Sequence, residues 1–174
     1  MPRRHSDSQE FSRFIEADSV GAKPIERHIS ANAEERAAVA KRFDLVAIDR
    51  LEADFELRRA GNGVIHVAGT VQAQVVQSCV VTLDPVPDRV EERFAADFAA
   101  DAGKPSEADE IDFEAADPPE PIRNGHIDLG ELAAEHLALG LDPYPRAPGA
   151  SLPPQPEPAE PQAPAINPFA ILKK

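Results

Sequence analysis

Tryptophan is absent from this chain of 174 residues, and tyrosine and cysteine each occur once. A single cysteine excludes a disulfide within the chain and any zinc site built from several thiolates. No apolar run reaches the roughly 18–20 residues that cross a bilayer, and no apolar stretch follows the basic residues near the N-terminus, as a secretory signal requires. We therefore expect a soluble, cytoplasmic protein that does not enter a membrane.

Basic residues are also scarce. The 18 lysines and arginines stand against 31 acidic residues, which gives a net charge of −13. Nucleic-acid affinity comes mainly from Lys and Arg side chains that neutralise phosphates, so this balance argues against a surface that grips DNA or RNA as a whole. The imbalance lies in residues 84–145, which carry 17 acidic and 4 basic residues.

Proline is abundant, and its placement divides the chain. Of the 18 prolines, ten fall between Asp142 and Pro168, where they oppose helix and sheet formation and favour an extended linker. The predicted division is a flexible N-terminus at 1–9, one domain at 10–145 with an acidic loop at about 101–120, a proline-rich linker at 146–165 and a short apolar segment at 166–174. The terminal segment can dock on its own domain or on a partner, and the sequence leaves both open.

A β-hairpin is the clearest element. Apolar and charged residues alternate from Leu51 to Leu57, and the alternation resumes on odd positions from Ile65 to Val75, the period-two pattern of half-buried strands. A three-residue turn at 61–63 pairs 57 with 67, 55 with 69 and 53 with 71, which keeps both apolar faces on one side. A two-residue turn would place one of them in water, so we expect the longer turn.

Further strands follow from weaker alternation. Continued odd parity places Cys79, Val81 and Leu83 inward, with Gln77 as a polar exception, before the chain turns at Asp84. The next strand is expected around the alternating residues 90–98, and additional strands at 11–17 and 25–30.

Two helices are indicated by their N-terminal caps. Asn32 and Glu35 have capping-box spacing and predict a helix over about 33–43, and Asp128 with Glu131 repeats this spacing. The second helix has an apolar stripe and must end before Pro143. The predicted fold class is α+β: an antiparallel sheet, open or curled into a partial barrel, with two helices and a disordered proline-rich C-terminal arm.

Four segments in order resemble a known family: Cys79–Val86, Ile127–Leu139, Asp142–Pro145 and Asn167–Leu172. They are similar to the YceD-like proteins, the bacterial large ribosomal RNA subunit accumulation family, in an alphaproteobacterial-style form. The resemblance implies a cytoplasmic protein needed for the synthesis, processing or stability of large-subunit ribosomal RNA. Relatives often carry a second cysteine where this chain has Thr82, so any metal site of theirs is not expected here.

The resemblance also supplies positions with a structural or interaction role. These family-motif positions are Cys79, Leu83, Pro85, Val86, Asp128, Leu129, Glu131, Pro143, Pro145, Pro168 and Phe169.

Each residue with reactive chemistry also has a plain explanation. Cys79 could be a nucleophile if its pKa were lowered, but its parity and apolar neighbours favour a buried strand residue. Glu131 is explained by capping, and its neighbour on the helix face, Glu135, by exposure. The five histidines have no metal-ligand spacing, so we expect neither metal nor cofactor.

The basic residues leave one alternative open. Two groups, Arg36, Lys41 and Arg42 on the first helix and Arg58 and Arg59 beside the hairpin turn, could converge on RNA. Ordinary solvated charges, balanced by neighbouring glutamates, are the favoured interpretation, and direct RNA contact is left undecided.

We therefore expect a non-enzymatic ribosome biogenesis factor that acts by binding. The alternative is a small RNA-processing or hydrolytic enzyme that uses Cys79 or a carboxylate cluster. The expected partner is a ribosomal protein or a precursor particle of the large subunit, because an acidic segment repels phosphates and attracts basic proteins. The candidate contacts are Glu107, Asp109, Glu110, Asp112 and Glu114; a loop that only improves solubility is the competing interpretation.

Overall fold

The computed structural model describes residues 10–100, 102 and 118–151. The elements in chain order are β1 (Phe14–Glu16), the 3-10 turn η1 (Ala17–Ser19), β2 (Ile25–Ser30), α1 (Ala33–Arg42), β3 (Ala47–Arg59), β4 (Ile65–Ser78), β5 (Pro85–Ala99), β6 (Glu120–Pro121), β7 (His126–Asp128) and α2 (Leu129–Gly140). The predicted N-terminus at 1–9, most of the acidic loop and the terminal segment at 166–174 lie outside the described residues, and the domain division stays a prediction.

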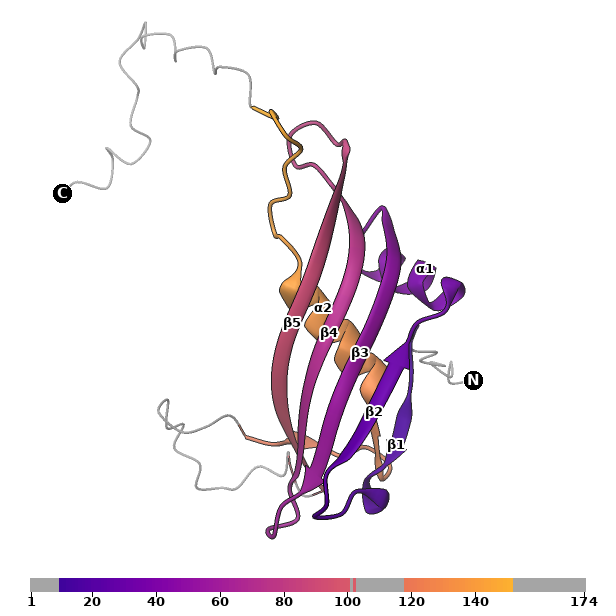
Figure 1. Cartoon of the computed structure of the whole chain (residues 1–174), viewed down its shortest axis with the longest axis vertical. Coiled ribbons are helices and arrows are strands. Elements are labelled where there is room, and N and C mark those ends of the chain that lie inside the picture. The colour runs from indigo at the N-terminus through magenta and orange to yellow at the C-terminus, as the bar shows by residue number, and fades with distance from the viewer. Residues whose placement is uncertain (1–9, 101, 103–117, 152–174) are drawn as a thin grey trace, which may run out of the picture.

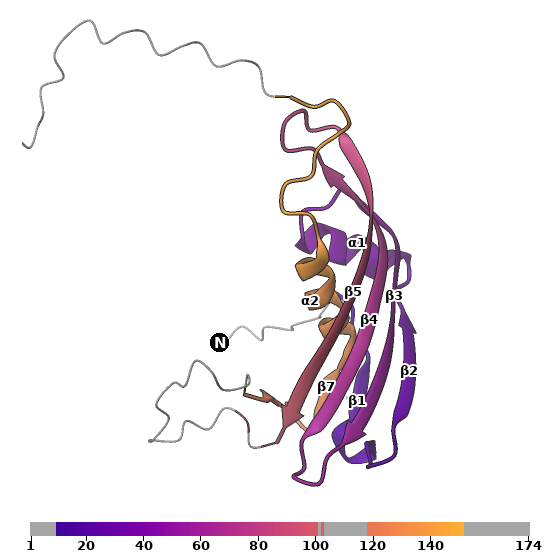
Figure 2. The ribbon, with the colours of Figure 1, turned by 60° about the vertical axis from the view of Figure 1, so that its left-hand side comes forward.

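One sheet dominates the described part of the chain (Figure 1). Its five strands have the order β2-β3-β4-β5-β6, and all neighbours are antiparallel except β6, which pairs in parallel with β5. Strands β1 and β7 form a separate antiparallel pair. The α+β class is thus confirmed, and the sheet is open rather than closed into a barrel. It curves, with α2 on its concave side (Figure 2).

The hairpin of β3 and β4 has the predicted register. Leu57 pairs with Val67 and Ala53 with Val71, and the turn is closed by the Ala60 N–H, which donates to the Val64 carbonyl at 2.7 Å. The odd residues from Leu51 to Leu57 and from Ile65 to Val75, except the half-buried Gly69, are buried. They form one core cluster with Leu132 and Leu137 of α2. Burial of each such side chain contributes about 1.5–3 kcal/mol.

Both helix caps lie at the predicted residues. The Asn32 side chain accepts from the backbone N–H groups of Glu34 and Glu35, and the Glu35 carboxylate accepts from the Asn32 N–H, which completes a capping box. Asp128 caps α2 by accepting from the N–H groups of Gly130 and Glu131. These bonds satisfy N–H groups that a helix leaves unpaired at its start.

Two strand predictions need correction in their extent. The expected strand at 11–17 is reduced to the three residues of β1, because η1 follows immediately. The expected strand around 90–98 is longer and begins at Pro85. Prolines at 85 and 87 are tolerated because β6 pairs only with Phe98 and Ala99, so β5 is the edge strand at these positions and needs no N–H on its outer side.

The inward prediction for Leu83 is wrong. Leu83 is 78% exposed, and its backbone φ of 64° lies in the left-handed region. Strand β4 ends at Ser78, and a turn replaces the alternation that we extended: the Cys79 N–H donates to the Asp84 carbonyl, and the Leu83 N–H donates to the Cys79 carbonyl. Parity has no meaning once the chain leaves the extended conformation.

Candidate functional site

Residues of the family motif converge on the turn between β4 and β5, at the upper end of the sheet in Figure 1. Cys79 opens this turn and is completely buried. Its Sγ atom accepts from the backbone N–H groups of Val81 and Thr82, both at 3.4 Å, and of Ala147 at 3.3 Å. The cysteine therefore joins the turn to the segment that follows α2.

Two further hydrogen bonds hold that segment in place. The Val80 N–H donates to the carbonyl of Pro145 at 2.9 Å, and the buried Gln77 donates from Nε2 to the Asp142 carbonyl at 2.9 Å. Gln77, the polar residue on the buried face of β4, is thus explained by its hydrogen bond to the segment after α2. Pro145 itself is buried, whereas Pro143 is exposed.

The thiol of Cys79 has an unusual environment. The N–H group of Ala147 and the contacts from Thr82 and Val81 lower its pKa from 9.0 to about 6, although burial opposes the shift. N–H donors stabilise a thiolate. A nucleophile must also reach a substrate, and this sulfur has no exposed surface. The arrangement supports a structural role that ties two segments of the chain together.

The motif positions at the start of α2 lie apart from this turn. Asp128 caps α2, Leu129 is buried beneath its first turn, and Glu131 lies at the opposite end of the helix from Pro143. Pro85 and Val86 begin β5, directly after the turn. The remaining two positions, 168 and 169, are outside the described residues.

A cavity of about 570 Å³ lies between the first half of α2, β1, β7 and the end of β5. Four carboxylates and one guanidinium line it, together with apolar side chains. The lining residues used below are Phe14, Glu120, Arg123, His126, Glu131 and Glu135. Cavities of this size hold small ligands or single side chains of a partner.

Glu131 is neutralised inside the molecule. Its two carboxylate oxygens accept from the guanidinium of Arg42 at 2.7 and 2.9 Å. The prediction that Glu131 completes a capping box is therefore wrong: its side chain links α2 to α1 instead. The Asp128 carboxylate, which caps α2, also accepts from the backbone N–H of Arg13 at 2.7 Å.

Glu135 and Glu120 have no such partner. Neither forms an ion pair or a side-chain hydrogen bond with the part of the chain that the structure describes. Burial raises the pKa of Glu135, and the nearby charges of Glu131 and Glu120 raise it further, although Arg42 and Arg123 oppose them. The cavity thus holds excess negative charge.

His136 follows Glu135 on α2 and contacts β5. Its ring stacks on Phe94, with 3.8 Å between centroids and 9° between planes. Burial lowers the pKa of His136, and its Nδ1 atom has no hydrogen-bond partner. The ring therefore acts as an apolar packing group.

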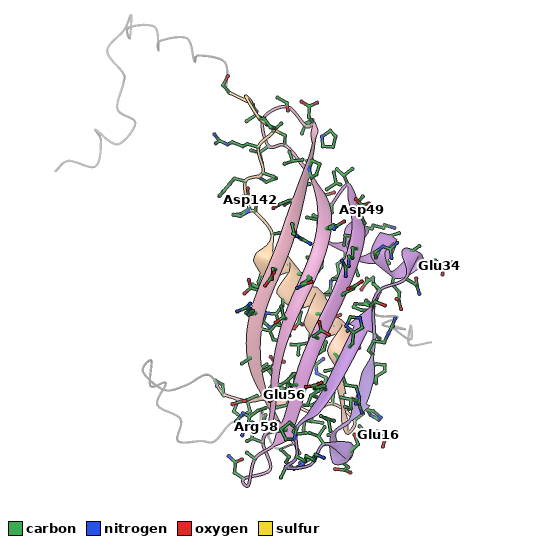
Figure 3. All side chains as sticks on the ribbon, in the orientation of Figure 1. Glu16, Glu34, Asp49, Glu56, Arg58 and Asp142 are labelled. Atoms are coloured by element: carbon green, nitrogen blue, oxygen red, sulfur yellow. The ribbon has the colours of Figure 1, made fainter. Side chains whose placement is uncertain are left out.

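The basic residues do not converge. Arg58 lies near the lower end of the sheet, whereas α1 lies toward the other end, where Glu34 is labelled (Figure 3). Arg59 and Arg36 donate to backbone carbonyls, and Arg42 is bound to Glu131. No continuous basic face is formed by the described residues.

The five acidic contacts predicted at 107–114 lie outside the described residues. Glu120, Glu135 and Arg123 were not predicted as site residues. The excess of acidic residues in 84–145 indicated that this region carries negative charge. It did not show that Glu120, Arg123 and Glu135 line one cavity, which depends on how β6 and β7 pack beside α2. Among the described residues, no three His, Cys, Asp or Glu side chains are placed to hold a metal ion.

Residues 67–174 match the model of the family described as large ribosomal RNA subunit accumulation protein YceD. The chain belongs to this family. The match covers β5, α2 and all but the first two residues of β4. It includes the Cys79 turn and every lining residue of the acidic cavity except Phe14, and the predicted resemblance is confirmed. The name of the YceD family connects the protein to accumulation of the RNA of the large ribosomal subunit.

No curated protein and no solved structure matches the chain. None of the helices among the described residues has the length and apolar character needed to span a membrane.

Proposed function

We propose that this YceD family member supports the accumulation of large-subunit ribosomal RNA by binding a basic protein of that subunit or of its precursor. It acts in the cytoplasm, without catalysis, and the acidic cavity is its contact site. The observation that carries the proposal is the pair of carboxylates, Glu120 and Glu135, that have no ion-pair partner among the described residues and whose mutual repulsion contributes to the raised pKa of Glu135.

A lysine or arginine side chain that enters the cavity removes this repulsion. Charge-assisted hydrogen bonds from a guanidinium to carboxylates are among the strongest that proteins form, and the aromatic rim around Phe14, which is 66% exposed, offers a surface for the alkyl stem. The acidic residues predicted at 107–114 steer the encounter. Such steering weakens as salt shortens the Debye length from about 10 Å at 0.1 M to about 3 Å at 1 M.

The test is depletion of the protein in cells, followed by profiling of ribosomal RNA and complementation with variants. The double variant Glu120→Gln, Glu135→Gln should fail to restore large-subunit RNA. The matched control is Glu26→Gln, Glu56→Gln, which removes the same charge from residues of β2 and β3 that are exposed, as Glu120 and Glu135 are, but lie outside the cavity. This control should restore large-subunit RNA. Unchanged large-subunit RNA after depletion would remove the proposal.

An enzyme that uses Cys79 is the second candidate, because a thiol with a pKa of about 6 is largely ionised at neutral pH. Full complementation by a stable Cys79→Ser variant would exclude thiol catalysis. Loss of function in a Cys79→Ser protein of unchanged stability would instead favour it over the binding role.

A further inference from the structure

The outer edge of β5 is unpaired along most of its length in the described part of the chain. Strand β5 has 15 residues, but β6 pairs only with Phe98 and Ala99. In Figure 1 this edge is the left side of β5, and no other described strand runs along it. Exposed edges offer N–H and C=O groups to an additional strand.

The direction of these groups follows from two hydrogen bonds. The Cys79 N–H donates to the Asp84 carbonyl, so even residues at this end of β5 bond to β4; the Ile122 N–H donates to the Ala99 carbonyl, so odd residues bond outward. Because hydrogen bonding alternates from residue to residue along an antiparallel strand, the even residues of β5 bond to β4 and the odd residues point outward along its whole length. The odd residues with a free outward N–H are Glu91, Arg93, Ala95 and Asp97, and they span about 20 Å at about 3.4 Å per residue. The N–H of Arg89, the next odd residue, already donates to Oδ1 of Asp88 at 2.7 Å.

The chain itself interrupts strand addition at this edge. Residues 118, 119 and 121 are prolines, which lack the N–H that a longer β6 would need to donate. Strand β6 accordingly has two residues. The edge from Asp97 to Arg89 is thereby left without a strand from the described residues.

The surroundings of the edge specify the chemistry of an added strand. On the face that carries α2, Phe94 and Ala96 are only partly buried, and Leu139 on α2 is 74% exposed. Gly140 of the same helix turn lies close to β5, because a Cβ atom added there would be 2.6 Å from Cγ1 of Val90 and 3.5 Å from Cβ of Glu92. Apolar side chains of an added strand would cover these groups.

Charge determines which strand fits. Glu92 lies on the α2 face of β5 and forms no ion pair with the described residues, and Glu120 and Glu135 of the acidic cavity stand where β5 meets β6. An added strand therefore meets three carboxylates that form no ion pair with the described residues. This favours a segment that alternates basic and apolar residues.

We propose that an extended basic segment of the protein partner adds to the outer edge of β5 as a further strand, with its main chain bonded to the odd residues from Glu91 to Asp97 and its basic side chains at Glu92, Glu120 and Glu135. The inference rests on the proposed function and states how that partner is bound. Strand addition provides affinity through main-chain bonds, and the neighbouring side chains provide selectivity.

The test measures amide hydrogen exchange of the full chain at single residues, with and without proteins extracted from large ribosomal subunits and freed of RNA. Exchange at the odd residues from Glu91 to Asp97 should slow by about tenfold or more when these proteins are added. The even residues already bond to β4 and should change little.

A pair of variants at one residue isolates the main-chain bonds. Ala95→Pro removes an outward N–H and leaves the bonds to β4, so binding of the extracted proteins should weaken by about tenfold, which corresponds to the loss of roughly one strong contact. Ala95→Thr keeps the N–H and suits a strand, and its affinity should stay within about twofold. If Ala95→Pro does not fold, the exchange pattern of the natural chain decides.

Other outcomes overturn the inference in distinguishable ways. Binding without slower exchange at the edge places the partner elsewhere and leaves the proposed function standing. Slow exchange in the free chain at every concentration means that residues of this chain occupy the edge, and slow exchange that grows with concentration means that a second copy does. Protection by purified ribosomal RNA alone assigns the edge to RNA. Absence of binding to any extracted protein removes the proposed function as well.

Discussion

Replacement of Gly130 by alanine tests how tightly α2 packs against the N-terminal segment. A Cβ atom at this position would lie 2.5 Å from the carbonyl oxygen of Phe11, 2.8 Å from its carbonyl carbon and 2.9 Å from the Cα of Ser12. All three are backbone atoms, so no side-chain rotation can relieve the contact. The N-terminal segment must move away from the helix.

That movement acts on bonds described above. The Leu129 N–H donates to the Arg13 carbonyl at 2.9 Å, and the Arg13 N–H donates to Asp128 at 2.7 Å. Overpacking costs about 1–3 kcal/mol, and a weakened hydrogen bond costs about 1 kcal/mol. The better helix propensity of alanine returns about 1 kcal/mol. The net expectation is a loss of about 2 kcal/mol in the free energy of unfolding.

Urea and thermal unfolding followed by circular dichroism measure this loss. A change of about 2 kcal/mol lowers Tm by about 4–8 °C in a chain of this length. Gly21→Ala is the matched control, because nothing lies within 4 Å of its added Cβ, and its stability should stay within about 0.5 kcal/mol of the natural chain. Equal stability of the two variants would refute the packing of α2 on residues 11–13.

Three further outcomes are expected. The Cys79 thiol has a folded pKa of about 6 against an ordinary 9.0, so its ionised form stabilises the fold at high pH and this contribution is lost as the pH falls from 9 to 6. The difference in free energy of unfolding between the natural chain and Cys79→Ala should therefore shrink over that window. A constant difference would contradict the pKa shift. Leu83→Asn should raise the free energy of unfolding by about 0.5–1 kcal/mol, because asparagine tolerates a φ of 64° better than leucine; urea unfolding checks it, and a destabilised variant would contradict it. Arg42→Met should raise the pKa of Glu135 further, since Arg42 lowers it, and carboxyl NMR titration measures this change. The same variant should lower the free energy of unfolding by about 0.5–1 kcal/mol, which urea unfolding measures. An unchanged pKa would show that the charge of Arg42 does not act on Glu135.

The local part of the fold could be predicted from the sequence because its causes are local. The parity of apolar residues determined the register of β3 and β4, since the alternative exposes an entire face to water. The cap at Asn32 depends on residues three apart. These patterns act within one element or between neighbours, where a single sequence contains all the information.

The site depends on contacts between distant residues, and these left little signal. The bond from Arg13 to Asp128 joins residues 115 positions apart, and the Arg42–Glu131 pair joins residues 89 apart. Glu131 has capping-box spacing, yet a guanidinium from α1 competes successfully for its carboxylate. The error at Leu83 had another source, because a turn ends β4 at Ser78 although the alternation continues in the sequence.

The position of α2 in the chain has a consequence for synthesis on the ribosome. Its buried face covers residues of β4 and β5, yet Leu137 follows the end of β5 by 38 residues. At translation rates of about 5–20 residues per second, the apolar side of the sheet waits about 2–8 seconds for its cover. During that interval the nascent sheet exposes both this face and the β5 edge, so a chaperone near the exit tunnel meets its greatest demand at this stage.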